Sequence, residues 1–314
     1  LAIPLLEGTA QVLLLLCSTL LVGIAGTYEL TARNKYCSIL VEEPKKLAGY
    51  LTSFSVVFNV GKLVGPPIGG WLLAATGPAW ALGIDAASYL LPISSVMLLL
   101  SPNRDQEVCS SGGEDASLRN AWSHCGSTLQ GVLSFTGVLC LIVFYHPGLA
   151  PLIAFDQLGP KPTDLGLFTS VLAGGSIVGG LVLQRNSQRF CRRPFLTLGG
   201  FGLITAVAQL GMACTTGPGF SLAMAFLIGA GTAGLLSSCN LISQIGAPQV
   251  MRGRMAGLSQ IAFLGGGGLS GLIVALLVMI TNLSTAFALT GGLSAAVAVL
   301  WIRKRGARML EPLR

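Results

Sequence analysis

The 314-residue chain is 52% hydrophobic and only 10% charged, and its mean hydropathy is +0.74. Soluble domains carry about 25% charged residues, so this composition excludes an ordinary water-exposed surface. The formal net charge of +7 comes from cations that flank apolar segments, a pattern that indicates membrane topology rather than nucleic-acid binding.

Apolar segments long enough to cross a bilayer follow one another along the chain. A hydrocarbon core about 30 Å thick needs roughly 20 apolar residues of helix. The sequence predicts nine such helices, at approximately residues 9–29, 50–75, 79–100, 131–155, 165–184, 195–215, 219–245, 255–280 and 283–302. The predicted fold is therefore an all-α, polytopic transmembrane bundle.

The basic residues predict the orientation of this bundle. All lysines and arginines except Lys62 and Lys161 fall in the tail or in alternate loops on one side. Cytoplasmic loops collect Lys and Arg, so the C-terminus is predicted to be cytoplasmic. An odd number of spans then places Leu1 outside, and no signal-peptide features precede the first span. We therefore expect that further spans precede Leu1.

Residues 101–130 divide the chain into two parts. The segment mixes Ser, Gly and charged residues without apolar periodicity, as a solvated linker does. The predicted domains are the remainder of an N-terminal transmembrane half (1–100), a cytoplasmic linker (101–130), a C-terminal transmembrane half (131–302) and a basic cytoplasmic tail (303–314).

Glycine is unusually frequent, with 42 residues in the chain, about twice the usual share of ~7%. Small residues let transmembrane helices approach closely. Gly61 and Gly65 lie one turn apart on one face, as do Gly267 and Gly271, and Pro66 removes a backbone donor from its helix. Tight helix packing explains both glycine clusters; the alternative is that they mark helices that slide or pivot.

Two ionisable residues lie inside predicted spans, where charge is costly and usually functional. They are Lys62 in span 50–75 and Asp85 in span 79–100. Our hypothesis is that Asp85 binds a proton or a cationic substrate, with Lys62 as its electrostatic partner. The alternative is a structural ion pair that locks two helices.

Cations in the cytoplasmic loops have two possible roles. Arg185 and the sequence Arg252-Gly253-Arg254 could pair with acidic residues or helix C-termini to close a cytoplasmic gate. The alternative is that they set topology and meet anionic headgroups, at about 1 kcal/mol for each cation near the surface.

The sequence contains no motif that predicts an enzyme active site or a metal centre. There are only two histidines and no HExxH, nucleophile-elbow or P-loop motif. His124, Cys125 and Cys109 supply too few ligands for structural zinc. We predict no catalytic site, metal or cofactor. The pair His146-Pro147 predicts a kink with a hydrogen-bonded imidazole rather than a proton relay.

Three stretches resemble one family of membrane proteins. Residues 32–73 contain Gly65-Pro66-x-x-Gly69-Gly70, residues 83–91 read GIDAASYLL, and residues 240–258 contain Asn-x-x-x-Gln, Pro and Arg-Gly-Arg. In combination they resemble the major facilitator superfamily, in particular its branch of drug and siderophore exporters, which includes the enterobactin exporter and macrolide efflux proteins. The glycine–proline stretch is similar to the antiporter motif on that family's fifth helix.

This resemblance implies that the nine spans are helices four to twelve of a monomeric secondary transporter in the plasma (inner) membrane. It implies proton-coupled export of small amphiphilic molecules by alternating access, with no cofactor. One departure is the repeat of the family's acidic loop motif, which here has Gln184 where an acid is usual. The alternative is a non-transporting scaffold or truncated remnant, which the upstream reading frame would distinguish.

Overall fold

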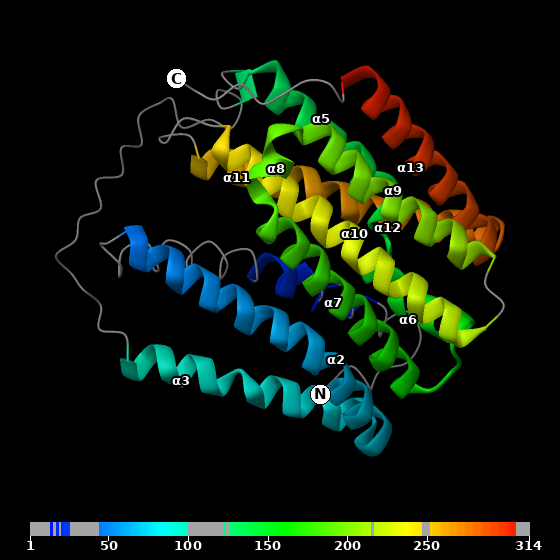
Figure 1. Ribbon diagram of the computed structural model, residues 1–314. Coiled ribbons are helices and arrows are strands. Elements are labelled where there is room, and N and C mark those ends of the chain that lie inside the picture. The colour runs from blue at the N-terminus through cyan, green and yellow to red at the C-terminus, as the bar shows by residue number, and fades with distance from the viewer. Residues whose placement is uncertain are drawn as a thin grey trace. The chain divides into compact units, whose positions relative to one another are not determined.

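The computed structural model divides the chain into two units, Leu1–Glu107 and Val108–Arg314. This boundary falls inside the segment predicted as a linker, 101–130. The two units are described separately below (Figure 1). The structure describes residues 13–14, 17–18, 20–25, 44–99, 122–123, 126–214, 217–246 and 252–305. Most of the first predicted span, 9–29, lies outside these residues, and those described in it are helical.

Unit 1 contains a helical hairpin formed by α2, Pro44–Ser88, and α3, Leu90–Leu99 (Figure 1). The chain reverses within α2 at Gly77, whose φ of 79° and ψ of 170° suit glycine because it lacks a Cβ. Pro78 then starts the second arm with a φ already suited to a helix. The two arms correspond to predicted spans 50–75 and 79–100, and the helix continues through Pro66.

Unit 2 contains six helices of membrane-spanning length and composition. They correspond to the six segments predicted as spans from 131–155 to 283–302, which are thus confirmed as helices of sufficient length and apolarity. Their elements are α5 (Ser127–Val143) with α6 (His146–Gln157), α7 (Pro162–Arg185), α9 (Pro194–Ala213), α10 (Pro218–Ile245), α11 (Arg252–Gln260) with η4 (Ile261–Gly265) and α12 (Gly266–Ile280), and α13 (Leu283–Arg305). A short helix, α8 (Ser187–Arg192), joins α7 to α9.

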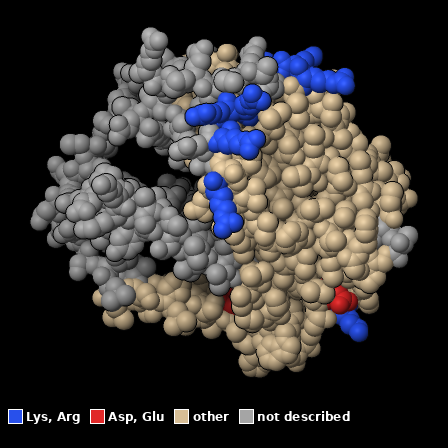
Figure 2. Space-filling model, viewed as in Figure 1, with Lys and Arg blue, Asp and Glu red and all other residues tan. Residues whose placement is uncertain are grey.

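Charged side chains of unit 2 separate to its two ends. Consecutive long helices reverse direction, so the end of α7, the start of α9 and the end of α13 lie together, whereas Lys161 lies at the start of α7. Figure 2 shows most of the described basic side chains at one end and one beside an acidic residue at the other. The separation follows the predicted pattern of the loops, while the side of the membrane that each end faces stays a prediction.

Glycines bring two helix pairs of unit 2 into backbone contact. A Cβ built on Gly229 of α10 would lie 1.9 Å from the carbonyl oxygen of Leu172 in α7, and one on Gly175 would lie 1.9 Å from that of Phe226. Helices α9 and α13 approach in the same way at Gly291. Small residues therefore hold these helices together, as is typical in lipid.

The glycines selected from the sequence, at 61, 65, 267 and 271, make fewer close contacts than those at the α7–α10 contact. Cβ atoms built on Gly61 and Gly65 would meet nothing within 4 Å among the described residues, so their packing role stays a prediction. In unit 2, Gly267 packs against the ring of Phe144, while a Cβ on Gly271 would meet nothing within 4 Å. Only the first glycine of that pair is in a close contact within the described part of unit 2.

The apolar interior of unit 2 forms two clusters. One contains Phe135, Phe195 and Phe201 toward the basic end, and the other contains Phe168 and Phe287 toward the opposite end. Helix α5 contributes to the first cluster, and α6 contributes to the second. The junction between α5 and α6 therefore lies where the two clusters meet.

Candidate functional sites

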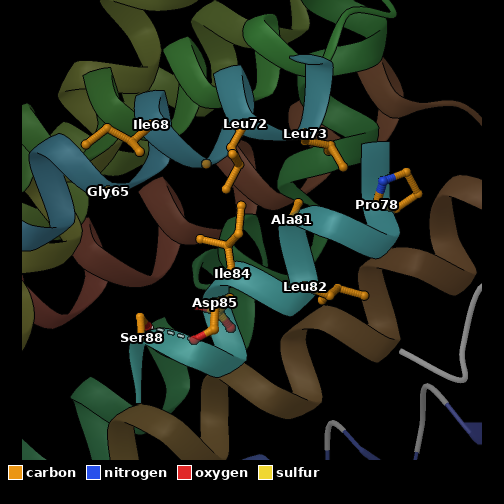
Figure 3. Close-up of a pocket in the computed structure, with 11 residues that line it drawn as sticks. Gly65, Ile68, Leu72, Leu73, Pro78, Ala81, Leu82, Ile84, Asp85 and Ser88 are labelled. Carbon is orange, nitrogen blue, oxygen red and sulfur yellow. Dashed lines mark hydrogen bonds between the residues drawn. The ribbon is translucent and has the colours of Figure 1, made fainter. Parts of the chain in front are cut away.

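A groove of about 540 Å³ lies between the two arms of α2 in unit 1 (Figure 3). Its lining is apolar apart from Asp85 and Ser88, and it includes Gly65 and Gly69 of the glycine–proline stretch. The Ser88 hydroxyl donates to the backbone oxygen of Asp85 at 2.7 Å rather than to its carboxylate. The structure thus brings the predicted carboxylate together with the predicted antiporter-like glycines.

The predicted partner of Asp85 lies at a different level of the hairpin. Lys62 precedes Gly77 by fifteen residues, and Asp85 follows Gly77 by eight. A helix rises about 1.5 Å per residue, so the difference of seven residues corresponds to about 10 Å. The Lys62 backbone is therefore farther from the turn than the Asp85 backbone by that distance. The Lys62 side chain lies outside the described residues, so the ion pair stays a prediction.

The predicted gate residues lie at helix ends in unit 2. Arg185 is exposed at the end of α7, and Arg252, Gly253 and Arg254 begin α11. The side chains of Arg252 and Arg254 lie outside the described residues. Close by in sequence, the Ser259 hydroxyl donates to Oδ1 of Asn240 and so ties α11 to α10. Among the side chains that the structure describes there is no pairing that tests the gate, which stays a prediction.

A second candidate site is the break between α5 and α6, which interrupts the span Ser127–Gln157 at Phe144 and Tyr145. Pro147 has no N–H to donate to the carbonyl of Val143, four residues earlier, so the helical bond there is lost. Gln209 of α9 replaces it, since its Nε2 donates to that oxygen at 3.2 Å. The kink predicted from His146-Pro147 is confirmed.

The residues of the break contact different helices of unit 2. The Phe144 ring packs on Phe263 of η4, with centroids 4.2 Å apart. The Tyr145 hydroxyl shares a hydrogen bond of 3.1 Å with Thr290 of α13. Together with Gln209, these contacts join the break to the helices that correspond to the third, fifth and sixth spans of unit 2.

The helix facing Phe144 is itself irregular. Residues Ile261–Gly265 form a π-helical turn between α11 and α12, a feature that recurs at functional sites. Directly after it, a Cβ on Gly266 would lie 2.9 Å from the carbonyl oxygen of Gly137 in α5. Two interrupted helices therefore meet through the rings of Phe144 and Phe263, and their backbones approach closely beside these rings at Gly266 and Gly137.

His146 begins α6 directly after Phe144 and Tyr145. It is 1% exposed, and the rings of Phe144 and Tyr145 have centroids 5.7 and 5.6 Å from its own. Neither imidazole nitrogen has a hydrogen-bond partner among the described residues, and the same holds for Oε1 of Gln209 and Oγ of Ser270. The prediction of a hydrogen-bonded imidazole was therefore wrong. Sequence reasoning also missed Gln209, whose signal was a lone amide within span 195–215.

The role of Gln209 can be measured directly. Gln209→Leu is expected to lower the free energy of unfolding by about 1–2 kcal/mol, because the buried carbonyl of Val143 loses its donor. Pro147→Ala restores a backbone donor to that carbonyl, so Gln209→Leu should cost less in this background. Denaturant titration of the four proteins in detergent gives the coupling energy. Gln184→Leu, at an exposed position, is the control, and equal losses in both backgrounds would refute the assignment.

Comparison with known proteins gives one family. The profile of the Major Facilitator Superfamily matches residues 1–269 and 132–312. The chain is 28% identical over 221 residues to the multidrug efflux pump Tap of Mycolicibacterium fortuitum, covering 65% of this chain and 50% of that protein. It is 26% identical over 272 residues to Tap of Mycobacterium tuberculosis H37Rv, covering 79% and 60%. The chain thus spans one half to three fifths of the length of these curated relatives.

Proposed function

Because the chain belongs to the major facilitator superfamily, we propose that it works as a secondary active exporter of small amphiphilic molecules. The observation that carries this proposal is the family match across both units, together with similarity to proteins named as multidrug efflux pumps. The family and the six apolar helices make it an integral membrane protein. Membership of a transporter family points to a protein that is not an enzyme.

The proposed mechanism is alternating access driven by exchange with protons. In transporters built from repeated halves, binding lies near the membrane midplane while the halves rock around it. The groove in unit 1 supports a role for Asp85, because its carboxylate is the only ionisable side chain among the residues that line this groove. An apolar wall with one acid suits an amphiphilic cation or a proton. We further propose that the protein works as a monomer with a cytoplasmic C-terminus.

Efflux from intact cells tests this function. Cells expressing the complete reading frame are loaded with a fluorescent cationic dye, a macrolide or a catecholate siderophore, and retention of each compound is followed over time. We expect faster loss of at least one compound, and we expect a proton ionophore to abolish this difference by removing the driving force. Cells with the empty vector are the control. Unchanged retention of the whole panel, despite folded protein in the membrane, would reject the proposal.

The orientation has a separate test. Single cysteines placed at Lys161 and at Arg314, in a background without native cysteines, are treated with a thiol reagent that does not cross membranes. We expect intact cells to label only the variant at Lys161, because basic segments remain in the cytoplasm. Labelling only at Arg314 would reverse the proposed topology.

A further inference from the structure

The break between α5 and α6 buries a histidine whose two nitrogens are unbonded within the described part of the chain. Most buried polar groups have partners, so an orphaned imidazole calls for an explanation. We propose that His146 is a proton-binding site, and that proton uptake there opens the contact between the break and the η4–α12 segment. Its use in coupling rests on the proposed transport function, but the proton site itself does not.

The surroundings of His146 show why a proton cannot simply be added in the packed state. No carboxylate approaches the imidazole among the described residues. The titratable and charged residues on the elements around it are Asp156 at the exposed end of α6, Asp164 and Arg185 at the two ends of α7, Cys140 on α5, Tyr145 in the break, Cys239 on α10, Cys214 after α9, Arg252 and Arg254 at the start of α11, and Arg303, Lys304 and Arg305 at the end of α13.

None of these groups supplies a counter-charge to a protonated imidazole in the packed state. The described acids of unit 2, Asp156 and Asp164, lie at the end of the unit opposite the basic end. Neither η4 nor α12 contains an ionisable residue. A buried charge without a partner is strongly destabilising. The imidazolium is therefore compatible only with an arrangement in which water reaches the break.

The contact that must open is suited to rearrangement. It consists of ring packing between Phe144 and Phe263 and of close approach at Gly266 and Gly267. Both helices already depart from regular α-helical bonding there, one at the break and one at the π-helical turn. The Phe144 ring packs on Phe263 and its centroid lies 5.7 Å from that of the imidazole, so we expect that parting this contact lets water reach His146.

The proton balance is simple. In the open state a neutral imidazole nitrogen accepts a proton from a hydronium ion and leaves water; on return to the packed state the imidazolium gives the proton back to water. The packed state binds no proton at His146, and the open state binds one, so falling pH favours opening. With a water-exposed histidine titrating near pH 6.5, the open population should rise about tenfold per pH unit below that value.

Hydrogen–deuterium exchange of the full chain in lipid nanodiscs tests this site without any substrate. Deuterium uptake is measured in peptides covering 139–150 and 259–268 and is corrected for intrinsic exchange. The pH is varied between about 8 and 5, because histidine titrates within this range. In the wild type we expect corrected exchange in both segments to rise together by about tenfold per pH unit below pH 6.5. In His146→Phe and His146→Asn the rise should disappear, whereas His124→Gln, which removes the other histidine, should behave like the wild type.

The same pH dependence in the two His146 variants, or no pH dependence in the wild type, would overturn the proposal. If neither variant folds, imidazole ¹⁵N shifts of His146 in the His124→Gln protein decide the matter. They should pass from neutral to protonated together with the rise in exchange, and a His146 that stays neutral throughout would refute the site. A confirmed exchange response in a protein without efflux would count against the transport function alone.

Discussion

Gly229→Val is expected to leave little folded protein. The new Cβ would lie 1.9 Å from the carbonyl oxygen of Leu172 and 2.9 Å from its carbonyl carbon, and these are backbone atoms that no rotamer change can move. Helices α7 and α10 would have to separate along their contact. Overpacking of this kind costs about 3 kcal/mol or more. The measurement is the yield of monodisperse protein in detergent and its midpoint of thermal unfolding.

The matched control for this substitution is Gly180→Val in α7. A Cβ at Gly180 would meet nothing within 4 Å among the described residues, while the loss of glycine and the gain of a branched side chain are the same. We expect the control to retain the wild-type yield. A similar loss in both variants would show that helix propensity, rather than the α7–α10 contact, determines the result.

Asp85→Asn is expected to reduce proton-driven efflux to the level of cells without the protein. An amide has nearly the shape of the carboxylate but takes up no proton near neutral pH, and no other ionisable side chain lines the groove. Ionisable residues within membranes are usually retained for such roles. The measurement is efflux from cells with an imposed pH gradient, normalised to the amount of folded protein in the membrane.

Two further variants distinguish the effect of losing the carboxylate from the effect of changing the shape of the groove. Asp85→Glu should keep measurable proton-driven efflux, because it keeps a carboxylate in the groove. Ser88→Ala removes a hydroxyl that bonds only the backbone oxygen of Asp85 in the described structure and should transport normally. Unchanged coupled efflux in Asp85→Asn would dismiss this residue as the proton or cation site and favour a structural role.

Hydropathy alone predicted the positions of the long helices of unit 2. Each of the six spans from 131–155 to 283–302 corresponds to a membrane-length helix, because bilayer thickness fixes how long an apolar segment must be. The reversal between the second and third predicted spans lies between residues 75 and 79, where their bounds placed it, and the structure supplies the reason. Gly77 takes a positive φ there, and Pro78 begins the next helical arm.

The family was also accessible from the sequence. The motif stretches at 32–73, 83–91 and 240–258 resembled the major facilitator superfamily, and the family match confirms that assignment. Neither the exporter branch nor the count of nine spans has been tested. The same is true of the roles of Lys62, Asp85 and the gate arginines, because pairing between helices depends on side-chain placement that residue type does not specify.

Local properties of the chain specify where the apolar helices lie, because the thickness of a bilayer sets their length. Proline marks a possible kink but does not enforce one, since α2 continues through Pro66 whereas the helix breaks before Pro147. Packing between distant segments specifies that Gly175 and Gly229 face backbone, that Gln209 donates to the carbonyl of Val143, and that His146 is buried without a partner among the described residues. These contacts join segments far apart in the chain. They depend on the rotation and tilt of each helix, which packing against its neighbours sets.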